Sequence, residues 1–120
     1  MVRSGFVLAS TVGAMVAVSL GAASAQSTRP PWCSEGGSKN PSERTICATQ
    51  ALWNLDDTLN LSYAFALDRL PASQKEILKS SQANWLRETR NACATDVACL
   101  AREMRSRMST LDDINNRGHL

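Results

Sequence analysis

The feature that most constrains the fold of this chain is a set of four cysteines in a small protein. They lie at Cys33, Cys47, Cys93 and Cys99. Cysteines stay reduced in the cytosol and form disulfides in oxidising compartments outside it. Whether these four bind a metal, act as a redox pair or form disulfides therefore depends first on the compartment that the chain reaches.

Residues 1–25 have the pattern of a secretory signal peptide. Arg3 supplies a positive charge, residues 5–20 are almost continuously apolar or small, and Ala23-Ser24-Ala25 matches a small-x-small cleavage site. The apolar run is short and rich in glycine, whereas a spanning helix needs about 20 apolar residues. We expect cleavage after Ala25, an exported protein and no membrane anchor after cleavage.

Size and charge narrow the possible partners of the remaining chain. Cleavage takes away 25 of the 120 residues and one of the 13 basic ones, which leaves 95 residues with 12 basic and 11 acidic side chains. This near-neutral balance gives no field that would recruit nucleic acid or an anionic membrane. A domain of this size is marginally stable on its hydrophobic core alone, and in an exported chain two disulfides would supply the missing stability.

The spacing of the cysteines argues against a metal site and against a redox site. Zinc ligands come in close pairs, but here 13 residues separate the first two cysteines, five separate the last two, and His119 is the only histidine. A thioredoxin-type site needs C-x-x-C at the start of a helix, and the sequence has none. More than one disulfide pairing is possible. We favour nearest neighbours, Cys33 with Cys47 and Cys93 with Cys99, because the other pairings join distant helix ends.

Capping signals and hydrophobic periodicity predict helices, with no strand pattern. Residues 26–40 are rich in Pro, Gly and Ser and predict an irregular N-terminal arm. Asn40, Pro41 and Glu43 then have the spacing of an N-cap, a first helical residue and the acidic member of a capping box. The helix that begins at Pro41 is expected to be short.

Three longer helices are predicted after it, each with its own start and stop signals. They span residues 50–70, which Pro71 ends, Ser73 to about Cys93, which a capping box of Ser73 and Glu76 begins, and Thr95 or Asp96 to about residues 115–118. Residues 41–117 are thus expected to form one all-α domain. We expect a small antiparallel three-helix bundle with a short extra N-terminal helix, stapled by two disulfides.

The apolar residues at steps of three and four predict which face of each long helix points inward. The expected inward residues are Leu52, Leu55, Leu59, Tyr63, Ala66 and Leu70 on the first helix, Leu78, Ser81, Trp85, Thr89 and Ala92 on the second, and Val97, Leu100, Met104, Met108 and Leu111 on the third. Trp85 is expected to fill the core on the leaner stripe of the second helix.

Three stretches of the sequence also resemble a known family. They are "ERTIC" at 43–47, "LDDTLNLSY" at 55–63 and "QANWLRETRNACATDVACL" at 82–100. Together they look like the pattern of the LprI-like lysozyme inhibitor family, whose members are small exported bacterial domains, over residues 33 to about 111. The family's cysteines fall on the four cysteines of this chain, and its aromatic and polar positions fall on Asp56, Tyr63, Trp85, Arg90 and Asp96. The interval from Trp85 to Arg90 is one residue longer than in that pattern.

The resemblance implies a periplasmic or secreted domain of a Gram-negative bacterium. Its protein partner would be lysozyme, which it would bind and inhibit, and it would thereby protect peptidoglycan without catalysis and without a cofactor. The alternative is an envelope interaction or assembly module of the same fold that lacks affinity for lysozyme. Such a module would dock a bacterial partner or a second copy of itself as a homodimer.

Asp56 and Arg90 are predicted to form a structural polar pair. Asp56 lies about 40° from Leu52 on the first long helix, towards the inward face, and a buried carboxylate needs a partner. Arg90 on the second helix is the partner that we expect. Each side chain could instead be solvated separately.

Five residues are candidates for binding a partner. Leu61 and Phe65 are four residues apart and about 180° and 220° from Leu52, so they face away from the predicted core. Exposed apolar pairs of this kind often mark interaction sites, although the N-terminal arm with Trp32, or Trp53 with the first helix, could cover them. The acidic candidates, which would complement a basic lysozyme, are Glu35, Asp57 and Asp68.

The sequence gives no pattern of an enzyme. Adjacent carboxylates at Asp56-Asp57 and Asp112-Asp113 point about 100° apart on a helix, so they do not form an acid and a base that face one bond. A single histidine near the end of the chain argues against a histidine-based triad. Arg102, Arg105 and Arg107 are spread around the third helix and are expected to be solvated.

Overall fold

The computed structural model describes residue 13 and residues 28–120. Apart from Gly13, the expected signal peptide and its cleavage site lie outside the described residues. Every regular element of the described part is helical, which confirms the all-α class. The elements are the 3-10 turn η1 (Pro31–Ser34), α1 (Pro41–Ala48), α2 (Gln50–Arg69), α3 (Ala72–Trp85), the π-helical turn η2 (Leu86–Arg90), the 3-10 turn η3 (Asn91–Cys93) and α4 (Val97–Arg117).

Side-chain caps begin two of the helices, as the sequence predicts. Asn40 accepts a hydrogen bond from the backbone N–H of Glu43, and the Glu43 carboxylate accepts one from the N–H of Asn40, which completes the capping box of α1. Asp96 accepts from the N–H of Cys99 at the start of α4. At the other end of α4, Gly118 adopts a left-handed conformation with φ of 74°, which glycine tolerates without steric cost.

The predicted capping box of Ser73 and Glu76 is wrong. α3 begins at Ala72, so Ser73 already lies inside the helix, and the first turn has no side-chain cap. The carbonyl of Pro71 accepts from the N–H groups of Gln74 and Lys75 instead. A proline at this position holds an extended backbone immediately before the helix, and its carbonyl starts the helical bonding two residues earlier than expected.

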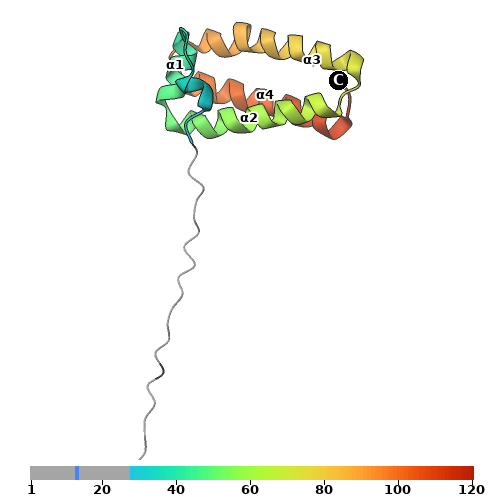
Figure 1. Cartoon of the computed structure of the whole chain (residues 1–120), viewed down its shortest axis with the longest axis horizontal. Coiled ribbons are helices and arrows are strands. Elements are labelled where there is room, and N and C mark those ends of the chain that lie inside the picture. Colours follow the sequence, from blue (N-terminus) through green and yellow to red (C-terminus); the bar gives the residue numbers. More distant parts are fainter. Residues whose placement is uncertain (1–12, 14–27) are drawn as a thin grey trace, which may run out of the picture.

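The three long helices run alternately along one axis (Figure 1). α2 and α4 point the same way and pack most closely, while α3 runs antiparallel to both. Hydrogen bonds between helices agree with these directions, because Ser62 bonds to Asp112 across α2 and α4, and Gln82 bonds to Arg107 across α3 and α4. α3 lies further from α2 than α4 does, and its buried Leu78 packs against the side chains of both helices.

The core consists of two apolar clusters that Trp85 joins, since this side chain packs against both. Their buried members are Leu59, Ala66, Leu70, Leu78, Leu111 and Ile114 in one cluster, and Ile46, Leu52, Cys93, Leu100 and Met104 in the other. Half of the predicted inward residues are among these buried members, and Leu55, Tyr63, Trp85 and Met108 are partly buried against them. Ala92 is exposed instead, because a π turn and a 3-10 turn interrupt the regular helix before it, and Val97 is exposed as the first residue of α4.

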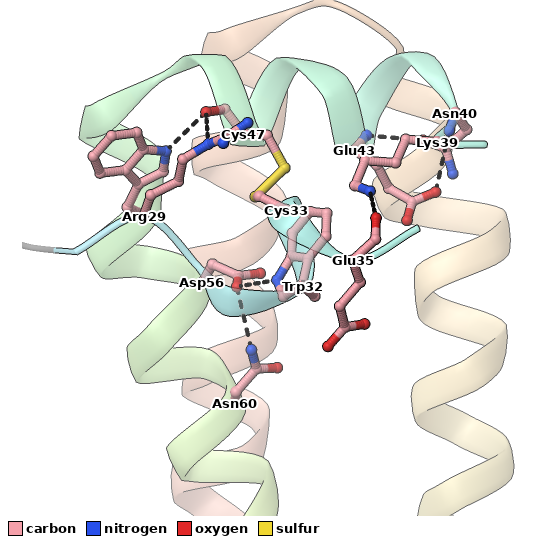
Figure 2. Close-up of a disulfide and its surroundings, with 11 residues drawn as sticks. Arg29, Trp32, Cys33, Glu35, Lys39, Asn40, Glu43, Cys47, Asp56 and Asn60 are labelled. Carbon is pink, nitrogen blue, oxygen red and sulfur yellow. Dashed lines mark hydrogen bonds between the residues drawn. A yellow bond between two sulfur atoms is a disulfide. The ribbon is translucent and has the colours of Figure 1, made fainter. Parts of the chain in front are cut away.

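Two disulfides fasten the irregular parts to the helices. Cys33 of η1 is bonded to Cys47 of α1, and Cys93 of η3 is bonded to Cys99 in the first turn of α4. This is the nearest-neighbour pairing, and it leaves no free cysteine. Figure 2 shows the first bond holding the arm against α1 and the start of α2. None of the helices in the described residues has the length and apolar character needed to cross a membrane.

Candidate functional site

An open cleft of about 280 Å³ lies between α2 and the end of α3, beneath the N-terminal arm. Its lining residues are Trp32 from η1, Glu43 from α1, Asp56, Asn60 and Tyr63 from α2, Gln82 from α3, and Leu86 and Arg90 from η2. All of these except Trp32 belong to the three sequence stretches that resemble the family. Stretches far apart in the sequence thus meet at one place on the surface.

Asp56 is the centre of the polar network in this cleft. Its carboxylate is only 4% exposed, and its Oδ2 atom accepts hydrogen bonds from Trp32 Nε1 at 2.9 Å and from Asn60 Nδ2 at 3.2 Å (Figure 2). The sequence suggested neither donor. Trp32 lies in an arm without helical periodicity, so periodicity does not predict its position. The Cys33–Cys47 disulfide holds it near Asp56.

Arg90 lies in the same cleft but does not bond directly to Asp56. No ion pair within 4.0 Å joins the two among the described residues, and Arg90 Nε donates to Asn91 Oδ1 at 3.1 Å. The two charges still interact, because the Arg90 guanidinium lowers the pKa of Asp56. The two side chains thus interact electrostatically without a direct bond, and their structural role as a polar pair remains a prediction.

Burial dominates the electrostatics of both groups. It raises the pKa of Asp56 above its ordinary value of 3.8, against the opposing effects of the Trp32 hydrogen bond and of Arg90. Burial likewise lowers the pKa of Arg90, while the negative charges of Glu43 and Asp56 oppose this. Both charges are thus partly desolvated and only partly compensated, a situation that is common in binding sites.

The π-helical turn η2 places Leu86 and Arg90 in the cleft. In this turn the N–H of Asn91 bonds to the carbonyl of Leu86, five residues earlier, so the turn holds one more residue than an α-helical turn. The turn covers the interval from Trp85 to Arg90, which the resemblance to the family pattern indicates to be one residue longer here. Trp85 can therefore pack on the core while Arg90 faces the cleft. Single π turns of this kind are frequent at functional sites.

We expect Asp56→Asn to be at least as stable as the unsubstituted protein at neutral pH. Asparagine keeps an oxygen that accepts from Trp32 and Asn60, and it removes a charge that burial disfavours. Because the pKa of Asp56 is raised on folding, its protonated form contributes stability that is fully present below 3.8 and is lost as the pH rises through the raised folded value. The advantage of the variant should therefore be largest at neutral pH and disappear in acid.

Chemical denaturation of both proteins at neutral pH and below 3.8 measures this difference. Asp57→Asn is the matched control, because Asp57 is the exposed neighbour on the same helix. A loss of stability at neutral pH in Asp56→Asn that exceeds the loss in the control would show that the charge of Asp56 stabilises the fold.

The outer face of α2 carries four of the five candidate partner-binding residues. Leu61 and Phe65 are 56% and 61% exposed, and Trp32 does not cover them because it is bonded to Asp56. Asp57 and Asp68 are exposed as well. With about 100° between successive residues, these four fall within an arc of about 80°. We call them the outer stripe: an apolar pair with a carboxylate towards each end.

Two features lie beside or away from the outer stripe. Phe65 borders a shallow hollow with Arg69, Asn115 and Asn116, at the edge where α2 meets α4. Glu35, the fifth candidate, is exposed on the arm, and its carbonyl accepts from Lys39 Nζ. In Figure 2 the Glu35 side chain extends from the arm near Trp32, so it belongs to the surroundings of the cleft.

Arg107 is not solvated as predicted. Its guanidinium lies 6.0 Å from the centre of the Trp85 ring and donates to Gln82 Oε1 at 2.8 Å and Ser81 Oγ at 3.1 Å. Arg102 and Arg105 are exposed, as expected. Arg107 differs because it sits on the face of α4 that meets α3. Its planar group matches the amide and the aromatic ring there, a pairing between helices that one-helix periodicity does not reveal.

Within the described part of the chain, no group of three or more His, Cys, Asp or Glu side chains is arranged to hold a metal ion. Comparison with known proteins gives one finding. A family model described as "Lysozyme inhibitor LprI" matches residues 33–111. No curated protein and no solved structure matches the chain.

Proposed function

Because the chain belongs to the LprI lysozyme inhibitor family, we propose that it is a non-catalytic protein of the bacterial envelope that binds and inhibits lysozyme and so protects peptidoglycan. The observation that carries the proposal is the family match over residues 33–111, which includes both disulfides and most of the helical domain. The disulfides suit an oxidising compartment, either the periplasm or the exterior.

We further propose that lysozyme docks on the outer stripe of α2. Lysozymes that hosts secrete are commonly basic, and opposite charge on the partner accelerates association. The chain as a whole is nearly neutral, so complementary charge has to be local. The outer stripe supplies it, because Asp57 and Asp68 flank an apolar anchor of Leu61 and Phe65 on a rigid helix.

A titration of the purified, oxidised protein into a lysozyme cell-wall lysis assay tests the function. We expect inhibition that saturates near one protein per lysozyme, and loss of inhibition in a reduced and unfolded sample. Folded, oxidised protein that leaves lysozymes of more than one type fully active would contradict the proposal. Circular dichroism of the same samples establishes that the protein added was folded.

The second candidate function is an envelope interaction or assembly module without affinity for lysozyme. The exposure of Leu61 and Phe65 favours it, because an apolar pair in the open serves any protein partner equally well. A homodimer through the same stripe is the simplest case. Absence of inhibition together with a concentration-dependent dimer in analytical ultracentrifugation would favour this function.

A further inference from the structure

The cleft beneath the arm presents several polar atoms that have no hydrogen-bond partner among residues 28–120. Asp56 Oδ2 takes both hydrogen bonds of that carboxylate, and Gln82 uses Oε1 for Arg107, which leaves Asp56 Oδ1 and Gln82 Nε2 free. The terminal nitrogens of Arg90 and the hydroxyl of Tyr63 make no hydrogen bond either. Across the described residues, the one buried side-chain polar atom without a partner is Asn115 Oδ1. The free atoms of the cleft are therefore not fully buried.

These free groups include both donors and acceptors, and their charges limit the ligand. Glu43 and Asp56 face the cleft with negative charge, and Arg90 faces it with positive charge, without an ion pair between them. A simple anion would meet two carboxylates, and a simple cation would meet a guanidinium. A ligand that is neutral, and that donates and accepts hydrogen bonds at neighbouring atoms, avoids both penalties.

The apolar lining narrows the ligand further. Trp32 and Tyr63 contribute aromatic rings to the lining of the cleft, and Leu86 adds an aliphatic surface. The polar lining groups are planar carboxylate, amide and guanidinium groups, which can each bond to two adjacent hydroxyls, whereas aromatic rings pack against the carbon-bound hydrogens of a sugar ring. A volume of about 280 Å³ is small beside typical ligand pockets of roughly 300–1,000 Å³. It suits one or two sugar residues.

We propose that this cleft is a binding site for a neutral saccharide, with a sugar ring packed on its aromatic lining and its hydroxyls bonded to Asp56, Asn60, Gln82 and Arg90. The site is separate from the outer stripe. Asn60 lies about 80° around α2 from Leu52, whereas Leu61 and Phe65 lie at about 180° and 220°. The saccharide site and the apolar pair of the outer stripe therefore lie on different faces of α2.

The tryptophan indole signals in a nitrogen-15 NMR spectrum of the folded, oxidised protein provide the test. The chain has three tryptophans. Trp32 donates to Asp56 in the cleft, whereas Trp53 donates to the carbonyl of Cys47 and is not among the cleft residues. Titration with N-acetylglucosamine and with its trimer is expected to shift the Trp32 signal progressively to saturation and to leave the Trp53 signal in place.

Two variants and their matched controls complete the test. Arg90→Gln is expected to weaken saccharide binding roughly tenfold to a hundredfold, the effect of losing a hydrogen bond from a charged group, and Asn60→Ala roughly threefold to tenfold, the effect of losing one between neutral groups. Asn54→Ala and Arg102→Gln, exposed positions outside the cleft, should bind like the unsubstituted protein. Asn60 is itself exposed, so Asn60→Ala keeps the fold even if Arg90→Gln does not.

Two outcomes would overturn the proposal. The first is an unchanged Trp32 signal at saturating saccharide in a protein whose spectrum shows that it is folded. The second is a Trp32 shift caused by the zwitterionic dipeptide glycylglycine but not by either saccharide, which would assign the cleft to peptide ends. A saccharide effect that Asn54→Ala abolishes as completely as Asn60→Ala would count against the cleft as well.

Discussion

Reduction of both disulfides is expected to lower the free energy of unfolding by about 5 kcal/mol. Each bond restricts the unfolded chain by closing a loop. The two bonds join residues 14 and six positions apart, for which loop-closure entropy gives about 3 and about 2 kcal/mol. Small domains have only about 5–15 kcal/mol in total. The reduced protein should therefore lose between about a third and all of its stability.

Urea denaturation followed by circular dichroism, with and without a reducing agent, measures the effect. A variant with serine at all four cysteine positions is the control, since the reducing agent should leave its unfolding midpoint unchanged. Variants that lack one disulfide at a time separate the contributions of the two bonds to the free energy of unfolding. Cys33→Ser with Cys47→Ser should free the arm and keep most of the bundle, whereas Cys93→Ser with Cys99→Ser should loosen the connection between α3 and α4. An unchanged midpoint after full reduction would mean that the helices alone supply the stability.

The double variant Leu61→Ala, Phe65→Ala, which removes the apolar pair of the outer stripe, is expected to inhibit lysozyme about thirtyfold or more weakly than the unsubstituted protein. Large apolar side chains at the centre of an interface carry most of its binding energy. Alanine removes this contact without adding charge, which matters because new acidic residues would attract a basic lysozyme. Both side chains are exposed in the unbound protein, so its stability should change by only a few tenths of a kcal/mol.

The lysis assay with the double variant gives the inhibition, and thermal denaturation gives the stability. Ile77→Ala is the matched control, because Ile77 is an apolar side chain of α3 with 59% exposure, similar to that of Phe65. A double variant that inhibits like the unsubstituted protein would remove the outer stripe from the proposal. If Asn60→Ala or Arg90→Gln abolished inhibition instead, lysozyme would bind at the cleft.

Much of the fold follows from local signals in the sequence. The capping box at Asn40, the cap at Asp96 and the end of α2 before Pro71 depend on residues within one helical turn of each other. The spacing of apolar residues likewise predicts most of the core. The start of α3 was placed wrongly because two signals competed there, and the carbonyl of Pro71 outweighed the Ser73 hydroxyl.

Residue propensities could not predict the π-helical turn, because the turn depends on tertiary contacts on its two sides. Trp85 must reach the core and Arg90 is held beside Asp56, and an α-helix with the same number of residues would put them on different relative faces. The extra residue between these positions, compared with the family pattern, was the signal that could have predicted the turn. A single inserted residue in a helix is accommodated most cheaply by one wider turn.

The candidate site was predictable in part. Helical phase alone identified Asp56 as an inward carboxylate and Leu61 with Phe65 as an outward apolar pair, because all three depend on the geometry of one helix. Trp32 was missed as the donor to Asp56, since the two are 24 residues apart and the arm has no periodicity. The position of Trp32 immediately before Cys33 was the available signal, because a disulfide to the first helix holds this residue near the start of α2.

The attachment of Trp32 also determines where in the cell the cleft can exist. One wall of the cleft is not part of the helical bundle and is held by a bond that forms only under oxidising conditions. A reduced copy of the chain in the cytosol would lack that wall and would therefore not bind the sugars that are abundant there. Ligand recognition at the cleft would therefore require an oxidising compartment, because only there does the Cys33–Cys47 bond hold Trp32 in place.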